Sequence, residues 1–243
     1  MLVEDVLTIV FERLPVDAIC AAACVSRSWA GVGEMDCVWF PRLQRLLRAR
    51  AFVSDHIRVA FEAWRRSGAG PVPCRDLYAD AVADAFRTDL RRDEIAAVDE
   101  WQFRFKLSAG EGWAAEDPWW QGSSRRILLQ LRRDGRVLAI SDGRPFWGRP
   151  GSVSGRWVAE ESEGPTVVSM NGHPSYYVSR HPIHAGLILQ SCWCVLSSFP
   201  MARRGEDACM EDDALGLSPE NDARQAAEAA AYNDRVRVDT GVY

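Results

Sequence analysis

Lysine is nearly absent from this sequence: Lys106 is the only one, so 28 of the 29 basic residues are arginine. Basic charge is also in the minority, because 34 acidic residues leave a formal net charge of -5. Nucleic acid and anionic membrane surfaces repel a negatively charged chain at long range. We therefore expect neither a nucleic acid nor a membrane among its partners.

Long hydrophobic runs and a basic N-terminus are missing as well. No window reaches the roughly 18 apolar residues that a membrane span requires, and Glu4 and Asp5 stand where a secretory signal would carry basic residues. The seven cysteines form an odd number, which fits reduced thiols better than a disulfide framework. We expect a soluble protein of the cytoplasm, the nucleus or both, without a structural disulfide.

Signatures of catalysis and metal binding are also lacking. The sequence has no CxxC, HExxH or GxSxG motif, no phosphate-binding glycine loop and no dinucleotide fingerprint. Six residues could be drawn as metal ligands or as a cysteine–histidine pair: His173, His181, His184, Cys192, Cys194 and Cys209. We interpret Cys192 and Cys194 as residues on one face of a single strand, and expect no metal, no cofactor and no catalytic residue.

Short amphipathic helices are predicted at the N-terminus. Apolar residues at 6, 7, 10, 11 and 14 recur every three or four positions, and Pro15 then ends the stripe. Asp17 can cap a second helix, a third short helix should hold residues 38–40, and Pro41 should open another. Apolar spacing continues the helices over residues 43–66, with a break at 49–54, and over residues 76–97, with a break near Arg91.

The apolar period changes from helical to alternating at Trp101. Strands are expected at residues 101–106, 127–131, 137–140, 156–160, 166–170, 175–179 and 187–196. Asp134-Gly135 and Asn171-Gly172 are hairpin signals between them. We therefore predict an α+β protein whose antiparallel β domain, barrel-like or a sandwich of six to eight strands, is followed by an acidic loop and a C-terminal helix. The expected divisions are 1–47, 48–97 (a helical linker), 98–203 and 204–243.

The first of these divisions resembles the F-box. The resemblance rests on Leu2, the Glu4-Asp5 pair, the apolar helix, Leu14-Pro15, Val25-Ser26-Arg27-Ser28-Trp29 and Trp39. Val3, Ser26 and Ser28 depart from the usual pattern. A helical piece of this size is too small to bury all its apolar side chains internally, so several should face a partner.

The resemblance implies a non-catalytic, substrate-recruiting subunit of a Skp-cullin-F-box ubiquitin ligase. Its partners would be a Skp-type adaptor and, through it, cullin and a RING protein, together with an unknown protein substrate. Leu14, Pro15 and Trp29 are the expected anchors. The full set expected to contact the adaptor is Leu2, Leu7, Val10, Leu14, Pro15, Ile19, Val25, Trp29 and Trp39.

The remainder of the chain is rich in tryptophan. Residues 101–106, 113, 117–122, 174–182 and 191–201 are similar to the C-terminal domain of a plant-type group of F-box proteins. Adjacent strand residues face opposite ways, so one of Trp119 and Trp120 could line a substrate groove. The candidate substrate-binding residues are Trp113, Trp119, Trp120, Arg180 and His181.

The sequence also allows a second function for the β domain and suggests a role for the single lysine. The β domain could instead be a small-molecule-binding barrel or a cryptic enzyme with the F-box as a regulatory handle, which a sizeable apolar cavity would favour and a filled interior would not. F-box proteins can also be modified by their own ligases, and here the lysine target would be Lys106. If Lys106 lies in a sheet, this modification should be slow.

Overall fold

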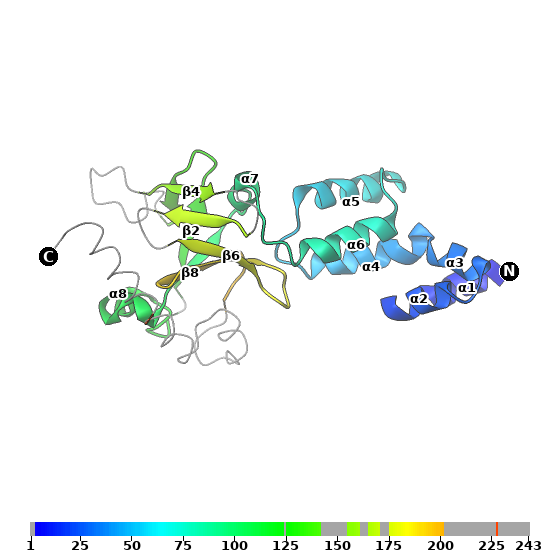
Figure 1. The fold of residues 1–243 in the computed structure, drawn as a ribbon, viewed down its shortest axis with the longest axis horizontal. Coiled ribbons are helices and arrows are strands. Elements are labelled where there is room, and N and C mark those ends of the chain that lie inside the picture. The colour runs from blue at the N-terminus through cyan, green and yellow to red at the C-terminus, as the bar shows by residue number, and fades with distance from the viewer. Residues whose placement is uncertain are drawn as a thin grey trace. The chain divides into compact units, whose positions relative to one another are not determined.

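The computed structural model describes residues 3–123, 125–141, 155–160, 165–170 and 175–201, together with residue 227. The chain divides into two compact units, Met1–Phe86 and Arg87–Tyr243. The first is built of helices and the second around a sheet (Figure 1). The predicted α+β class is therefore confirmed.

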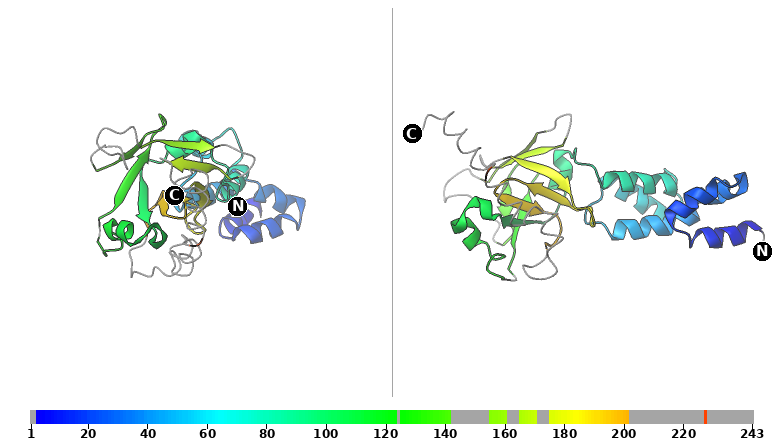
Figure 2. Two further views of the ribbon diagram at one scale, coloured as in Figure 1. Left: turned by 60° about the vertical axis from the view of Figure 1, so that its left-hand side comes forward. Right: turned by 60° about the horizontal axis from the view of Figure 1, so that its bottom comes forward.

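The first unit contains helices only, over the part of it that the structure describes. They are α1 (Val3–Phe11), α2 (Val16–Ala23), α3 (Arg27–Gly33), α4 (Asp36–Arg48), α5 (Asp55–Ser67) and α6 (Cys74–Asp84). The apolar stripe that predicted the first helix contributes Phe11 to a buried cluster with Ile19, Val32 and Trp39. Helix α4 packs against α6, and the two lie side by side in Figure 1 and in the right-hand view of Figure 2.

The prediction that Pro41 opens a new helix is wrong. Pro41 lies inside α4, which runs without interruption from Asp36 to Arg48. Proline removes a single N–H donor from the helix, the one that would bond the Cys37 carbonyl near the start of α4. Val38, Trp39 and Leu43 are all buried on one side of α4, and this packing holds the two halves in a single helix.

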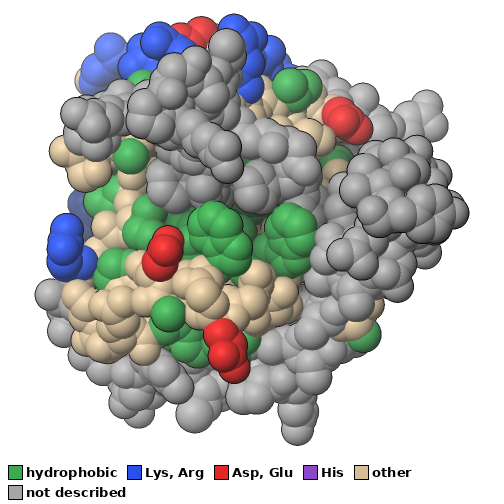
Figure 3. Space-filling view, turned by 90° about the vertical axis from the view of Figure 1, so that its left-hand side faces the viewer, with side chains coloured by type: hydrophobic (Ala, Val, Ile, Leu, Met, Phe, Trp, Pro, Cys, Tyr) green, Lys and Arg blue, Asp and Glu red, His purple; other side chains and the backbone are tan. Residues whose placement is uncertain are grey.

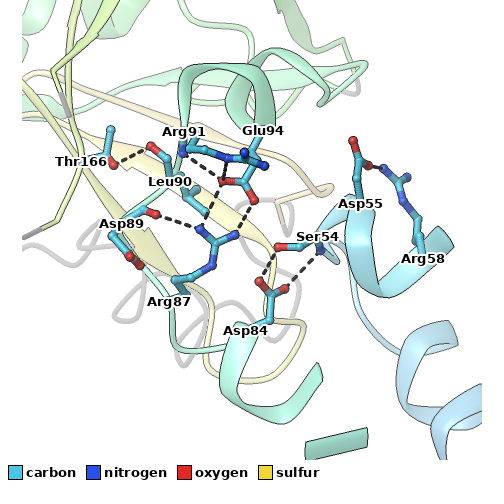
Figure 4. A network of polar contacts seen from close by, with 10 residues as sticks. All are labelled: Ser54, Asp55, Arg58, Asp84, Arg87, Asp89, Leu90, Arg91, Glu94 and Thr166. Atoms are coloured by element: carbon cyan, nitrogen blue, oxygen red, sulfur yellow. Dashed lines mark hydrogen bonds and ion pairs between the residues drawn. The ribbon is translucent and has the colours of Figure 1, made fainter. Parts of the chain in front are cut away.

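The chain between α4 and α5 breaks where the sequence predicted. The carboxylate of Asp84, at the end of α6, accepts hydrogen bonds from the Ser54 backbone N–H, at 3.2 Å, and from the Ser54 hydroxyl (Figure 4). This contact ties the end of α6 to the start of α5. The helical stretch predicted over residues 76–97, with a break near Arg91, is two helices, but the first ends earlier than predicted. Helix α6 ends at Asp84, and a new helix begins at Arg92.

The second unit begins with α7 (Arg92–Ala96) and continues into an eight-stranded antiparallel sheet. Its elements are β1 (Trp101–Phe105), η1 (Leu107–Ala109), α8 (Glu111–Glu116), β2 (Ile127–Leu131), β3 (Val137–Ala139), β4 (Trp157–Glu160), β5 (Val167–Met170), β6 (Tyr176–Arg180), β7 (Leu187–Gln190) and β8 (Cys194–Ser197). The strand order is β3-β2-β1-β8-β7-β6-β5-β4. A bridge between Arg136 and Arg156 joins the two edges, so the sheet is a nearly closed barrel.

The inward face of this barrel is filled with large side chains. Residues opposite each other in register share a face, and Trp101 lies opposite Leu129, while Phe105 lies opposite Cys194. Eleven side chains on this face are almost completely buried: Trp101, Phe103, Leu129, Leu131, Trp157, Val168, Met170, Tyr176, Leu187, Leu189 and Leu196. An eight-stranded barrel leaves an interior just wide enough for its own side chains.

The outward face is also covered over β1, β7 and β8. Phe199 and Met201 form a cluster with Ile188 and Val195. The backbone N–H of Met201 donates to the Gln102 side-chain oxygen at 2.9 Å. Every residue of β1 is therefore buried, on both faces of the sheet.

The hairpin predicted at Asp134-Gly135 is confirmed, and the single strand predicted over residues 187–196 is wrong. Gly135 has a φ of 85°, a conformation that glycine adopts readily, and joins β2 to β3. A tight turn at Ser191 splits the other segment into β7 and β8. The Ser191 hydroxyl accepts from Cys194 N–H, at 3.1 Å, so a polar side chain makes the turn without glycine or proline.

A polar network fixes the start of the second unit. Glu94 accepts from the backbone N–H of Arg91 at 2.9 Å and pairs with the Arg87 guanidinium (Figure 4). The Thr166 hydroxyl donates to the Leu90 carbonyl at 2.7 Å. The segment before β1 is thus anchored to the residues that lead into β5.

Three predictions fall outside the residues that the structure describes. They are the Asn171-Gly172 turn, the acidic loop and C-terminal helix within 204–243 except for residue 227, and the role of Leu2.

Candidate functional site

Helix α1 is apolar on two faces, and only one of them is buried. Leu7 and Phe11 pack into the cluster with Ile19 and Trp39. Val6, Ile9 and Val10, spaced by three and one, share the other face and remain 45–46% exposed. We call these three residues the α1 apolar face.

The C-terminal end of α1 is held by a side chain from α4. Arg42, itself buried, donates from Nη2 to the carbonyl oxygens of Phe11, at 2.7 Å, and Leu14, at 2.5 Å. The last carbonyls of a helix lack partners within the helix and carry partial negative charge, so a cation there satisfies and stabilises them. Burial lowers the pKa of Arg42 from its ordinary value.

Helix α3 is positioned by a cap and by two tryptophans. The Ser26 hydroxyl, at the N-cap, accepts from Trp29 N–H at 3.2 Å. The Trp29 ring meets Phe11 edge-on, with ring centroids 6.0 Å apart. Trp39 donates from Nε1 to the Gly33 carbonyl at 2.7 Å. These contacts are those of a small packed module rather than of a flexible arm.

The residues predicted to contact an adaptor differ in their exposure to solvent. Ile19 and Trp39 are buried, and Leu7, Leu14 and Trp29 are half-buried against the same cluster. Val10, Pro15 and Val25 are exposed. The sequence prediction left out Val6, Ile9 and Met35, which are also exposed. The signal that could have found the first two is the second apolar stripe of α1.

The tryptophans predicted to bind substrate lie in the connection between β1 and β2. The expectation that Trp119 and Trp120 lie on a strand is wrong, because both lie in the turn that follows α8. Trp119 is buried, and its ring meets that of Trp120 edge-on at 4.7 Å between centroids. Trp120 is half-buried and donates from Nε1 to the Phe105 carbonyl at 2.8 Å.

A buried carboxylate shapes this connection. Asp117 accepts from the backbone N–H groups of Phe105, at 2.8 Å, and Trp119, at 2.9 Å. Its other partner is Arg104, 3.4 Å away and also buried. Burial raises the pKa of Asp117, against the effect of its hydrogen bonds, and burial lowers the pKa of Arg104 to about 10.

Trp113, on α8, is the exposed member of the group. It is 53% exposed and packs one side on Phe105, with centroids 5.4 Å apart. Leu107 is exposed nearby in the sequence, and Glu111 and Glu116 are exposed on α8. Figure 3 looks onto the side of the molecule where α8 lies, and shows hydrophobic side chains at the surface with acidic ones among them.

Arg180 and His181 lie at the other end of the barrel. Phe105 pairs with Cys194 at the start of β8, whereas Arg180 pairs with Leu187, which is level with the end of β8. His181 is buried, and its Nδ1 accepts from the N–H groups of Ile183 and His184, at 3.3 and 3.2 Å. The structure therefore does not bring all five predicted residues into one site.

Cys194, one of the candidate nucleophiles, is buried in β8. Burial raises the pKa of Cys194 to about 12, so its thiol is protonated at neutral pH. Cys192 lies in the turn between β7 and β8, which corrects the expectation that it shares a strand face with Cys194. In the part of the chain that is described, no three His, Cys, Asp or Glu side chains lie together as metal ligands. The described helices are also too short or too polar to span a membrane.

Comparison with known protein families matches residues 1–41 to the F-box domain. No curated protein and no solved structure matches the chain. The matched residues span α1 to α3 and the first part of α4, which include the α1 apolar face. F-box domains generally occur in non-catalytic subunits that bind a Skp-type adaptor and recruit substrates to a ubiquitin ligase. The chain thus carries an F-box domain at its N-terminus.

Proposed function

We propose that this protein is the substrate-recruiting subunit of a Skp-cullin-F-box ligase, with no chemistry of its own. The observation that carries the proposal is an F-box domain whose first helix presents an apolar face to solvent. The mechanism is proximity: holding a substrate near the charged ubiquitin-conjugating enzyme raises the effective concentration of its lysines.

The α1 apolar face and Val25 are the proposed centre of the adaptor contact. Three branched apolar side chains on one short helix form a contiguous patch, and such patches mark interaction surfaces. Val25 adds a fourth side chain, 67% exposed. The remaining residues of the predicted set support this contact mainly by packing inside the module and positioning the helices that carry the exposed residues. They are Leu7, Leu14, Ile19, Trp29 and Trp39. Pro15 and Leu2 complete the proposed set.

The connection between β1 and β2 is the proposed substrate contact. Trp113 supplies a large exposed ring on a rigid support, and aromatic side chains of this kind dominate binding energy at interfaces. Trp119 and Trp120 hold that support. The filled interior of the barrel favours recognition at the surface over an internal ligand. Arg180, half-buried at the opposite end, would serve a second contact, and the buried His181 would hold the turn beside it.

The proposal extends to the relatives of the β unit and to the place of the protein in the cell. The likeness of the β unit to the plant-type group rests on its tryptophan-rich segments. The protein would reside in the cytoplasm, the nucleus or both, where cullin and RING partners would complete the ligase. Neither is needed for the adaptor contact.

Calorimetric titration against a purified Skp-type adaptor tests the proposal. The unchanged chain should bind, and Val10→Glu combined with Val25→Glu should weaken binding at least about 100-fold, because two charges would be desolvated at the interface. Val59→Glu is the matched control, since Val59 on α5 is as exposed as Val25, at 67%. Equal binding by all three chains, or no binding by the unchanged chain, would refute the proposed contact.

The substrate side has its own test. Trp113→Ala should raise the abundance of a set of cellular proteins, and the same set should rise with the Val10→Glu/Val25→Glu chain. Tyr177→Ala is the control, because Tyr177 is an exposed aromatic residue on β6. A Trp113→Ala chain that degrades the same proteins as the unchanged chain would exclude Trp113 from the substrate contact.

A further inference from the structure

The single lysine of this chain is completely buried. Lys106 is 0% exposed, although lysine is among the residues most often left at the surface. It lies between the last residue of β1 and the start of η1. The amine that would accept ubiquitin is therefore enclosed by protein in the folded chain.

The surroundings of Lys106 hold it in place through the backbone on each side. Its own N–H donates to the Trp193 carbonyl at 2.8 Å. The N–H and carbonyl of the preceding Phe105 bond Asp117 and Trp120, at 2.8 Å each. Phe105 also pairs with Cys194 across to β8. The charge of Lys106 also acts on the Cys194 thiol at the start of β8. We therefore expect the Lys106 amine to become exposed when the end of the β1–β8 pairing opens or the connection that carries Asp117 lifts.

Ubiquitin transfer needs direct access to that amine. The neutral Nζ attacks the carbonyl carbon of the thioester that joins ubiquitin to the cysteine of the conjugating enzyme. The new C–N bond forms as the C–S bond breaks, the cysteine leaves as its thiolate, and the amine loses one proton to a base or to solvent. An amine without exposed surface cannot reach the thioester carbon.

We propose that Lys106 is a fold-gated ubiquitin acceptor, silent in the native chain and modified only in molecules whose β1–β8 end has opened. The inference rests on the proposed function, because it places the chain beside a charged conjugating enzyme. It implies that the ligase does not ubiquitinate the folded subunit on its lysine. A molecule with a damaged β unit instead exposes the one lysine that can mark it.

Amine labelling tests the enclosure without any ligase. The full chain is treated with an acylating reagent in native buffer and in urea, and modification at Lys106 is followed by mass spectrometry. Arg133→Lys supplies an exposed reference lysine in the same unit, since Arg133 is exposed. Lys106 should react at least about 100-fold more slowly than the introduced lysine in native buffer, as expected when reaction requires local opening. The two should react alike in urea.

Opening the connection should remove the protection. Asp117→Ala removes the acceptor for Phe105 N–H, next to Lys106, and should speed native labelling of Lys106 at least about tenfold. Glu116→Ala, at the exposed neighbouring position, should leave the rate unchanged. Native labelling of Lys106 at the rate of the introduced lysine would overturn the inference.

A reconstituted ligase then tests the ubiquitin step, with sites read from diglycine remnants. Modification should appear at the introduced lysine of the Arg133→Lys chain and not at Lys106 of the unchanged chain. Rapid modification of Lys106 in the unchanged chain would overturn the inference. If the introduced lysine stays unmodified although it labels freely, the proposed function fails, while the labelling result still decides whether Lys106 is enclosed.

Discussion

Nη2 of Arg42 lies 2.7 Å from the carbonyl oxygen of Phe11, the last residue of α1. The contact joins α4 to the end of the helix that presents the α1 apolar face. Helix α1 has only nine residues, too few for a stable helix on its own in water. Its shape therefore depends on tertiary contacts, and Arg42 provides one that is both charged and buried.

Replacing Arg42 should destabilise the first unit. Arg42→Met keeps much of the side-chain volume and removes the donors to Phe11 and Leu14, which should cost about 2–4 kcal/mol, because hydrogen bonds from charged groups are stronger than neutral ones. Hydrogen exchange of the α1 backbone amides, measured at increasing urea concentration, gives the free energy of unfolding that this cost lowers. Arg45→Met is the control, since Arg45 on α4 is exposed. A cost equal to that of the control would contradict the capping role.

Glu94 should make stability depend on pH. Burial alone would raise the pKa of Glu94, but hydrogen bonds and charges from Arg87 and Arg91 leave it below its ordinary value. A depressed pKa means that Glu94 stabilises the fold above the pKa of the unfolded chain, and that this stability is lost as pH falls through the folded pKa.

The corresponding variant is Glu94→Gln. It should lower unfolding free energy by about 1–2 kcal/mol at pH 7, with a difference that shrinks as pH falls below about 4. Thermal unfolding across this pH range provides the measurement. Glu62→Gln should change little at any pH, because its pair with Arg65 is exposed. A Glu94→Gln deficit that grows on acidification would show that the sign is wrong.

Asp117 should be critical for the connection between β1 and β2. Asp117→Ala leaves Arg104 buried without its carboxylate and removes the acceptor for two backbone N–H groups, which should cost about 3–5 kcal/mol. Chemical denaturation, compared with Glu116→Ala, measures the loss. A loss below about 1 kcal/mol would mean that the connection is held by its aromatic packing alone.

The cysteines should divide sharply by reactivity. Burial raises the pKa of both Cys74 and Cys194 to about 12, whereas Cys20, Cys24 and Cys37 are exposed. At pH 8 the two buried thiols should stay unmodified by iodoacetamide while the three exposed ones react, because the thiolate is the nucleophile. Peptide mass spectrometry with a urea-unfolded reference resolves the sites. Early alkylation of Cys194 would show that the barrel opens readily at β8.

The parts of this structure that the sequence predicted are those specified by neighbouring residues. The apolar stripe that ends at Pro15 and the apolar–polar alternation that starts at Trp101 each reflect a local period. The dipeptide Asp134-Gly135 is by itself typical of a hairpin turn. The turn at Ser191 was missed because a serine side chain makes it within an unbroken apolar run. Trp119 and Trp120 were expected on a strand although Asp117-Pro118 is a local turn signal. In the structure, Asp117 accepts from the N–H of Trp119, two residues on, as in an Asx turn.

The contacts that shape the candidate site lie far apart in the chain. Arg42 reaches back 31 residues to Phe11, and no periodicity indicates that one arginine among 28 is buried against a helix end. Lys106 is likewise fully buried and bonds through its backbone N–H to Trp193, which lies far along the chain. Local pattern identified the α1 helix, but only the packed structure shows which of its two apolar faces is exposed.

Hydrogen exchange of the chain with and without a Skp-type adaptor tests the central claim most directly. We expect the adaptor to slow exchange in α1 and in the residues around Val25, while the β unit exchanges as it does alone. Protection confined to the β unit, or no change within residues 3–41, would contradict the claim that this protein docks through the exposed face of its F-box.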